Sequence, residues 1–235
     1  MTWKVISLAV LILALLGGLV AGCATMMSQP MLGRYSYSQK ELYQGQPVRV
    51  IPIWIDKDFG EADRVAIDDA LQAWNYAMNG YIRLKVVDTS FDMEVDKIVQ
   101  QVNQNGWLIM KIKSDNPLVP TSEKGYWTIG FTEKIGGNHL YLVRDRLANE
   151  DVFGVTLHEI GHLMGSGHVG ERLMYPHYSR ARFQCIDYVT IAKVADYQNL
   201  PVSALNYCTD KDMSEASQPP TKPEGGPVLI ECPVK

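Results

Sequence analysis

The chain has 235 residues, of which 46% are hydrophobic and 20% charged, a composition typical of a globular protein with one main domain. Its formal net charge of −4 provides no basic surface, so we exclude nucleic acid as a partner. The sequence carries no long run of like charges and no internal repeat, which excludes repeat architectures.

The N-terminal stretch has the layout of a secretory signal, with Lys4, a long apolar run, and small residues before Cys23. Its end, VAGC, resembles the bacterial lipobox. The resemblance implies a signal peptide over residues 1–22, lipidation of Cys23 (palmitate among the acyl groups), and a lipidated tether over residues 23–46. Ala24 follows the lipidated cysteine, and its identity resembles the sorting pattern of outer-membrane lipoproteins. This resemblance implies the outer membrane as the location if the host has one. The alternative is an uncleaved membrane anchor, although a span needs about 20 apolar residues and this run is marginal. Both readings place the chain outside the cytoplasm, in the cell envelope.

The next part of the chain predicts a strand, a helix and two further strands. Residues 48–55 alternate apolar and other side chains, which is a strand signal. Residues 61–80 carry an apolar stripe at helical spacing and end in glycine, so they predict a helix. Strands are expected again at residues 81–88 and 107–113, and residues 89–105 are expected to form an inserted helix or loop.

The second half predicts two strands and then a helix. Residues 126–131 and 139–143 have strand patterns, and the glycines of the TEKIGG segment between them suit a turn. A helix is expected to begin near Asn149, whose side chain would cap it. Gly165 and Gly167 are expected to end this helix.

A last helix is expected within residues 185–200, because Pro201 stops it. The tail over residues 209–235 is rich in Pro, Ser and Glu without an apolar face, so we expect it to be disordered. The domain between tether and tail, residues 47–208, is predicted to be α+β. It would have a mixed twisted sheet, one helix that carries the site, and a C-terminal helix.

Three cysteines follow the lipobox, and none belongs to a C-x-x-C pair. An exported protein can form disulfides. Cys185 and Cys208 are the preferred pair, because both lie at the edges of the predicted last helix. Cys232 is then left over or pairs elsewhere, and the sequence does not fix the connectivity.

The segment HEIGHLMGSGH holds three of the five histidines of the chain. His158 and His162 lie one helical turn apart on the same face, which lets both rings reach one zinc ion. Glu159 is turned about 100° from His158, so it can reach a water beside that ion. Gly165 allows the chain to turn back, and His168 then supplies a third ligand. The sequence therefore predicts one zinc ion, held by three histidines.

The full pattern H-E-x-x-H-x-x-G-x-x-H resembles the signature of the metzincin zinc endopeptidases. Residues 173–176, LMYP, are similar to their Met-turn, and the likeness is nearest to the matrixin branch. The resemblance covers residues 47–200. It implies a metzincin-like zincin fold, three histidine ligands, Glu159 as the general base and Met174 as the Met-turn methionine beneath the site. It also implies zinc-dependent hydrolysis of a protein or peptide substrate.

An extended substrate would bind by strand addition to an exposed sheet edge. Residues 125–131 are the candidate edge, although their Tyr and Trp also fit ordinary strand packing. Tyr178 and the loop after Met174 are expected to wall the side-chain pocket. His139 and His177 are expected to be non-ligands.

Two other classes of protein remain open. One is a zinc-binding module without catalysis, and the other is a tethered lipoprotein that binds a partner. Glu159 argues against the first, because binding alone needs no base at that position. The oligomeric state is not fixed by the sequence, and a monomer is assumed.

Overall fold

The computed structural model describes residues 42–43, 45–91, 106–121 and 126–209. The predicted signal peptide, Cys23 and nearly all of the predicted tail lie outside these residues. The described end of the predicted tether forms a small hairpin, in which β1 (Leu42–Tyr43) pairs antiparallel with β2 (Gln46–Pro47). No helix within the described residues is long and apolar enough to cross a membrane.

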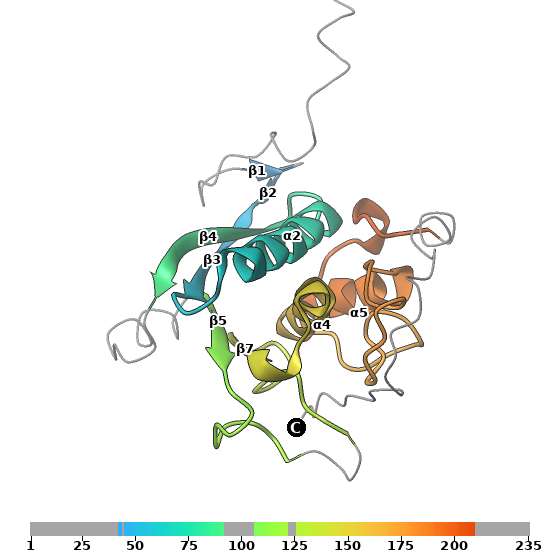
Figure 1. The fold of residues 1–235 in the computed structure, drawn as a ribbon. Coiled ribbons are helices and arrows are strands. Elements are labelled where there is room, and N and C mark those ends of the chain that lie inside the picture. The colour runs from blue at the N-terminus through green and yellow to red at the C-terminus, as the bar shows by residue number, and fades with distance from the viewer. Residues whose placement is uncertain (1–41, 44, 92–105, 122–125, 210–235) are drawn as a thin grey trace, which may run out of the picture. The chain divides into compact units, whose positions relative to one another are not determined.

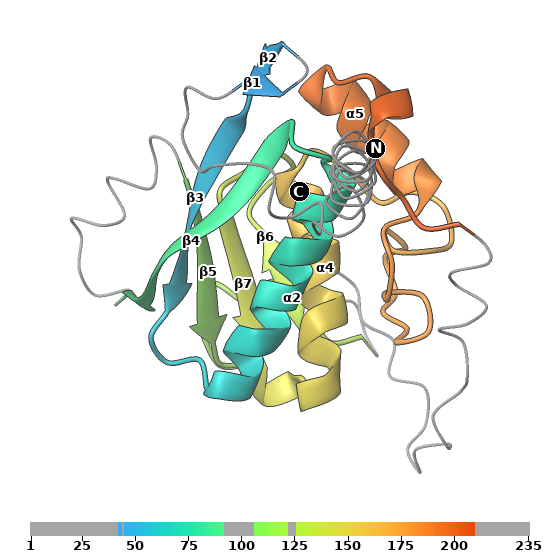
Figure 2. The ribbon, with the colours of Figure 1, turned by 90° about the horizontal axis from the view of Figure 1, so that it is seen from above.

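The centre of the fold is a five-stranded sheet with the order β4-β3-β5-β7-β6. Figure 1 labels β3, β4, β5 and β7 of this sheet, and Figure 2 also labels β6. Its strands are β3 (Arg49–Asp56), β4 (Ile82–Phe91), β5 (Trp107–Ile112), β6 (Gly130–Thr132) and β7 (His139–Val143). The first four strands in that order pair in parallel, and β6 pairs antiparallel with β7. Among the described strands β6 is an end member of the sheet, so one of its sides is an edge there.

Within the described residues, three α-helices accompany the sheet: α2 (Glu61–Ala77), α4 (Val152–Leu163) and α5 (Tyr188–Gln198). Figure 2 shows α2 and α4 lying side by side against one face of the sheet. The mixed sheet, the helix that carries the histidine motif and the C-terminal helix confirm the predicted α+β fold class.

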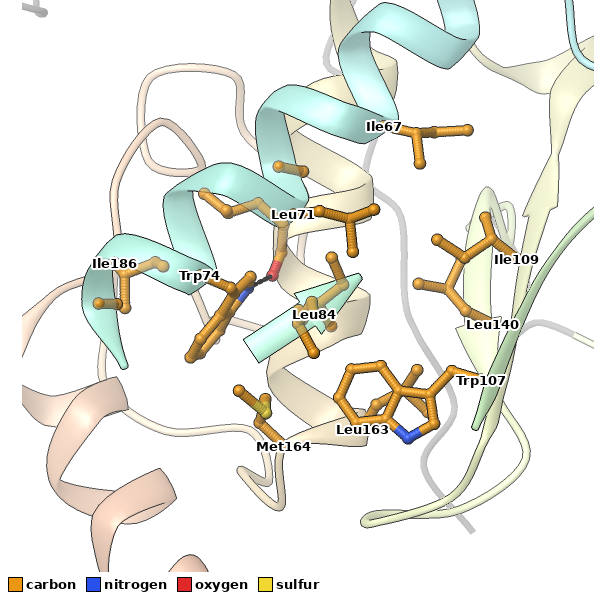
Figure 3. Close-up of a cluster of buried hydrophobic side chains, with 14 of the residues drawn as sticks. Ile67, Leu71, Trp74, Leu84, Trp107, Ile109, Leu140, Leu163, Met164 and Ile186 are labelled. Carbon is orange, nitrogen blue, oxygen red and sulfur yellow. Dashed lines mark hydrogen bonds between the residues drawn. The ribbon is translucent and has the colours of Figure 1, made fainter. Parts of the chain in front are cut away.

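The main core lies between this face of the sheet and the two helices (Figure 3). Trp74 of α2 is fully buried, and its indole N–H donates a hydrogen bond to the carbonyl of Leu157 in α4 at 2.9 Å. Ile109 and Leu140 face the helices from neighbouring strands of the sheet. This packing fixes α4, and therefore the histidine motif, relative to the sheet.

Two sequence predictions about local structure are wrong. Asn149 does not cap α4, because it begins a separate 3-10 helix, η3 (Asn149–Asp151), and its side-chain oxygen accepts a hydrogen bond from Arg144. The strand expected over residues 126–131 is shorter, since β6 begins at Gly130. The reason is that β7 ends at Val143, where the chain turns into a 3-10 helix. The residues just before β6 therefore have no partner strand among the described residues.

The last helix, α5, is held in place by a helix cap and by a disulfide. The last helix begins at Tyr188, later than expected, because the side chain of Asp187 caps it by accepting the N–H of Thr190 at 3.1 Å. Cys185 and Cys208 form a disulfide with their Cα atoms 6.1 Å apart, and this is the pair preferred from the sequence. The bond ties the segment before α5 to the segment that follows it.

Candidate metal centre

The three motif histidines converge because α4 ends directly after the second of them. His158 and His162 lie on α4, whose last residue is Leu163. Gly165 then adopts φ 107, a left-handed conformation that favours glycine, and the turn carries His168 back toward the helix. One ligand atom of each histidine lies within 4.8 Å of the corresponding atoms of the other two.

The imidazole rings of the two histidines on α4 are each oriented by a hydrogen bond from Nδ1. Nδ1 of His158 lies 2.5 Å from the carbonyl oxygen of Leu173, and Nδ1 of His162 lies 2.8 Å from that of Ser166. A carbonyl oxygen only accepts, so each Nδ1 carries the proton and each Nε2 keeps its lone pair. A hydrogen bond from Nδ1 to a carbonyl oxygen fixes the tautomer and the direction of a histidine that binds metal through Nε2.

The residues of this centre fit a metal ion. The Nε2 atoms of His158, His162 and His168 are all buried, and none has a hydrogen-bond partner within the described part of the chain. Buried polar atoms without partners are costly, and several converging on one point are explained by a shared ligand. Three neutral imidazoles match the donor set of a catalytic zinc ion.

Burial also keeps these histidines in the form that binds metal. Desolvation lowers the pKa of His158 well below its usual value and that of His162 to about 4, and the charge of a neighbouring histidine adds to both effects. Desolvation lowers the pKa of His168 as well. All three are therefore neutral at pH 7, and neutral imidazole is the state that coordinates a metal.

Glu159 lies on the same helix as His158 and His162, is fully buried, and approaches the strand β6. A Cβ atom built on Gly130 of β6 would lie 3.2 Å from the Oε1 atom of Glu159 and 2.6 Å from a methyl group of Val155. Only a glycine therefore lets β6 approach the carboxylate so closely. Sequence reasoning did not identify Gly130, although a glycine inside a strand pattern signals close backbone approach.

Met174 packs directly against the helix that carries the ligands. It is fully buried, and a Cβ atom built on Gly161 would lie 2.5 Å from its sulfur. The preceding residue, Leu173, supplies the carbonyl that orients His158, and its own N–H donates to Asp187 at 3.3 Å. The turn after His168 is thus held between α4 and the cap of α5. Asp187 is a second residue that sequence reasoning missed.

Gly161→Ala is expected to lower the free energy of unfolding by about 1–3 kcal/mol, because the new methyl group overpacks the buried sulfur of Met174. The higher helix propensity of alanine offsets at most about 1 kcal/mol of this loss. Urea unfolding followed by circular dichroism measures the effect. Gly60→Ala is the matched control, since a Cβ atom there meets no other atom within 4 Å. Equal stability of the Gly161 variant and the wild type would contradict the close packing described above.

The other two histidines lie outside the cluster of three. Nδ1 of His139 is 3.1 Å from a carboxylate oxygen of Glu133, at the turn between β6 and β7. His177 stacks on Tyr126 with ring centroids 5.1 Å apart. The stack brings the residues that precede β6 into contact with the loop that follows Met174.

No protein-family model and no curated protein sequence matches the chain. Solved structures of other proteins are similar to it, and two of them are the following. High choriolytic enzyme 1, a hatching enzyme zinc-protease from Oryzias latipes (medaka fish), has a TM-score of 0.27 and 19% identity, over 52% of this chain and 46% of that one. Metalloproteinase-II from Bacteroides fragilis has a TM-score of 0.39 and 18% identity, over 64% of this chain and 54% of that one. The chain spans about half the length of these structures.

Proposed function

We propose that this protein is a zinc-dependent endopeptidase. The observation that carries the proposal is the convergence of three buried histidines, two of them on the helix whose buried Glu159 lies against Gly130 of the end strand β6. The histidines supply the ligands, the carboxylate supplies a base, and the edge supplies a place for an extended peptide. The resemblance of the motif to the metzincin signature, with Met174 as its Met-turn methionine, supports the same assignment.

Each residue of the site has a separate role in the proposed reaction. His158, His162 and His168 would hold the ion, and the carbonyl oxygens of Leu173 and Ser166 fix the tautomers of the His158 and His162 rings. A bound zinc ion supplies a Lewis acid that acidifies water and polarises a peptide carbonyl. The carboxylate of Glu159 removes a proton from the attacking water and passes it to the leaving amine. The free side of β6 pairs with the backbone of the substrate.

The experiment that tests this function is cleavage of casein by the zinc-loaded protein. We expect cleavage that 1,10-phenanthroline abolishes and that added zinc restores, because the chelator removes the ion from its histidine ligands. A protein that holds one zinc ion per chain but cleaves neither casein nor a broad peptide library would instead be a zinc-binding module without catalysis.

We also propose that the enzyme is a lipoprotein of the cell envelope, anchored through Cys23. The lipobox-like VAGC segment supports this location. Such a tether would hold the active site near the membrane and confine it to substrates on the outer side of the cytoplasmic membrane, or at the outer membrane where the host has one.

Cys23→Ser is expected to abolish lipid attachment, because serine lacks the thiol that receives the lipid. Growth with an alkyne-labelled palmitate measures attachment, and fractionation measures the share of protein in the membrane. Cys232→Ser is the matched control, and it is expected to keep both the label and the membrane location. Undiminished labelling of the Cys23 variant would show that the anchor is elsewhere.

A further inference from the structure

An aromatic side chain of this protein covers one face of a predicted metal ligand. The ring of Phe183 lies parallel to the ring of His158, with centroids 4.8 Å apart and an interplanar angle of 1°. Phe183 is only 2% exposed. Its backbone belongs to the segment between the Met-turn and α5, so it reaches the metal centre from the loop side.

The same residue also lies against α4 one turn before His158, through its Cβ atom and its backbone carbonyl. A Cβ atom built on Gly154 would lie 3.1 Å from the Cβ of Phe183 and 3.3 Å from the hydroxyl of Tyr178. Gly154 and His158 are four residues apart and share one face of the helix. The two aromatic side chains therefore occupy the space above this face, from Gly154 to the ring of His158.

Tyr178 holds Phe183 in this place. The two rings meet edge to face, with centroids 4.9 Å apart and an interplanar angle of 83°. The hydroxyl of Tyr178 donates to Oδ1 of Asp151 at 2.8 Å, and Nε of Arg180 donates to the same oxygen at 2.8 Å. Asp151 directly precedes α4. The loop is thus fastened to the start of the helix that carries the metal ligands.

A peptide paired with β6 would run along this covered face. Gly130 of β6 lies against Val155 and Glu159, which are one step around the helix from Gly154 and His158. Every second side chain of an added strand points toward α4. Glu159 must reach the amine that leaves, and that amine belongs to the residue that follows the cleaved bond. In a strand added with this residue facing α4, its side chain would point to the face that Phe183 and Tyr178 cover.

We propose that Phe183, positioned by Tyr178, restricts the residue after the cleaved bond to small side chains such as those of glycine, alanine and serine. The inference rests on the proposed peptidase function and specifies its substrate class. Phe183 fills the volume that a leucine or phenylalanine side chain of the substrate would need. Removing its ring opens that volume without changing a metal ligand or Glu159.

Two measurements test the inference on the zinc-loaded full chain. The first is the residue preference after the cleaved bond, read by mass spectrometry from a peptide library. The second is the dissociation constant of peptide hydroxamates that carry a methyl, an isobutyl or a benzyl group at that position, measured by calorimetry. The wild type is expected to favour alanine over leucine, and methyl over isobutyl, by at least about 10-fold.

Phe183→Ala is expected to lower both ratios at least about 10-fold, because a large side chain then fits beside His158. Phe183→Leu removes part of the ring while keeping an apolar side chain, so it should shift both ratios in the same direction by less. Phe59→Ala is the matched control, since Phe59 is 3% exposed and lies in the core near the start of α2. The Phe59→Ala variant loses the same kind of ring at a similarly buried position, and both preference ratios should stay at the wild-type values.

The outcomes separate this inference from the proposed function. A wild type that cuts before leucine as readily as before alanine, or binds all three hydroxamates equally, would overturn the role of Phe183 while leaving the peptidase intact. If the wild type cuts no peptide but the hydroxamates show the methyl preference and Phe183→Ala removes it, the restricted space is supported and the catalytic proposal fails.

Discussion

Glu159→Gln is expected to lower peptide cleavage by at least about 10²-fold, since loss of a general base costs about 10²–10⁴-fold. Glutamine keeps the size of the side chain and one hydrogen-bonding oxygen, but it cannot accept the proton of the attacking water. The three histidines are untouched, so zinc content should stay at the wild-type level. The comparison of kcat/KM on one peptide, with metal analysis of the same samples, measures both effects.

The control for this variant is Glu61→Gln, the same change on the exposed first turn of α2, which should leave cleavage unchanged. Cleavage by the Glu159 variant at the wild-type rate would remove this residue from the mechanism. Loss of zinc together with activity would assign Glu159 to metal binding or folding, which the buried position of its carboxylate also allows.

The metal motif could be predicted from the sequence because its geometry is local. Four residues on a helix set the relation of His158 to His162, and a glycine allows the turn that returns His168. The same holds for the apolar patterns of the central strands, whose alternation or β-branched content directly reflects burial. These features need no knowledge of what lies across the fold.

The errors and omissions have a different physical origin. The start of β6 depends on where its partner β7 ends, and the capping role expected of Asn149 depends on Arg144, whose guanidinium binds that side chain instead. Gly130 and Phe183 acquire their roles through contacts with α4 that join distant parts of the chain. A single sequence contains the residues but not these pairings.

His162→Ala is expected to abolish zinc binding at micromolar zinc and, with it, activity. His162 is fully buried, and its Nε2 atom has no hydrogen-bond partner within the described residues. A metal ion shared with His158 and His168 would provide that partner. Loss of a group that only hydrogen-bonds to a metal ligand typically weakens metal binding by about 10–100-fold, and loss of the ligand itself should weaken it by more. Calorimetric titration of the metal-free protein with zinc measures the change.

The same variant tests whether the metal stabilises the fold. An ion that binds only the native state at 100 times its dissociation constant adds about 2.7 kcal/mol to the free energy of unfolding. Zinc should therefore raise the Tm of the metal-free wild type but not that of His162→Ala. His139→Ala is the control, because His139 pairs with Glu133 outside the cluster and should keep the full zinc response. An unchanged Tm of the wild type on adding zinc, or an equal rise in the His162 variant, would contradict a three-histidine centre.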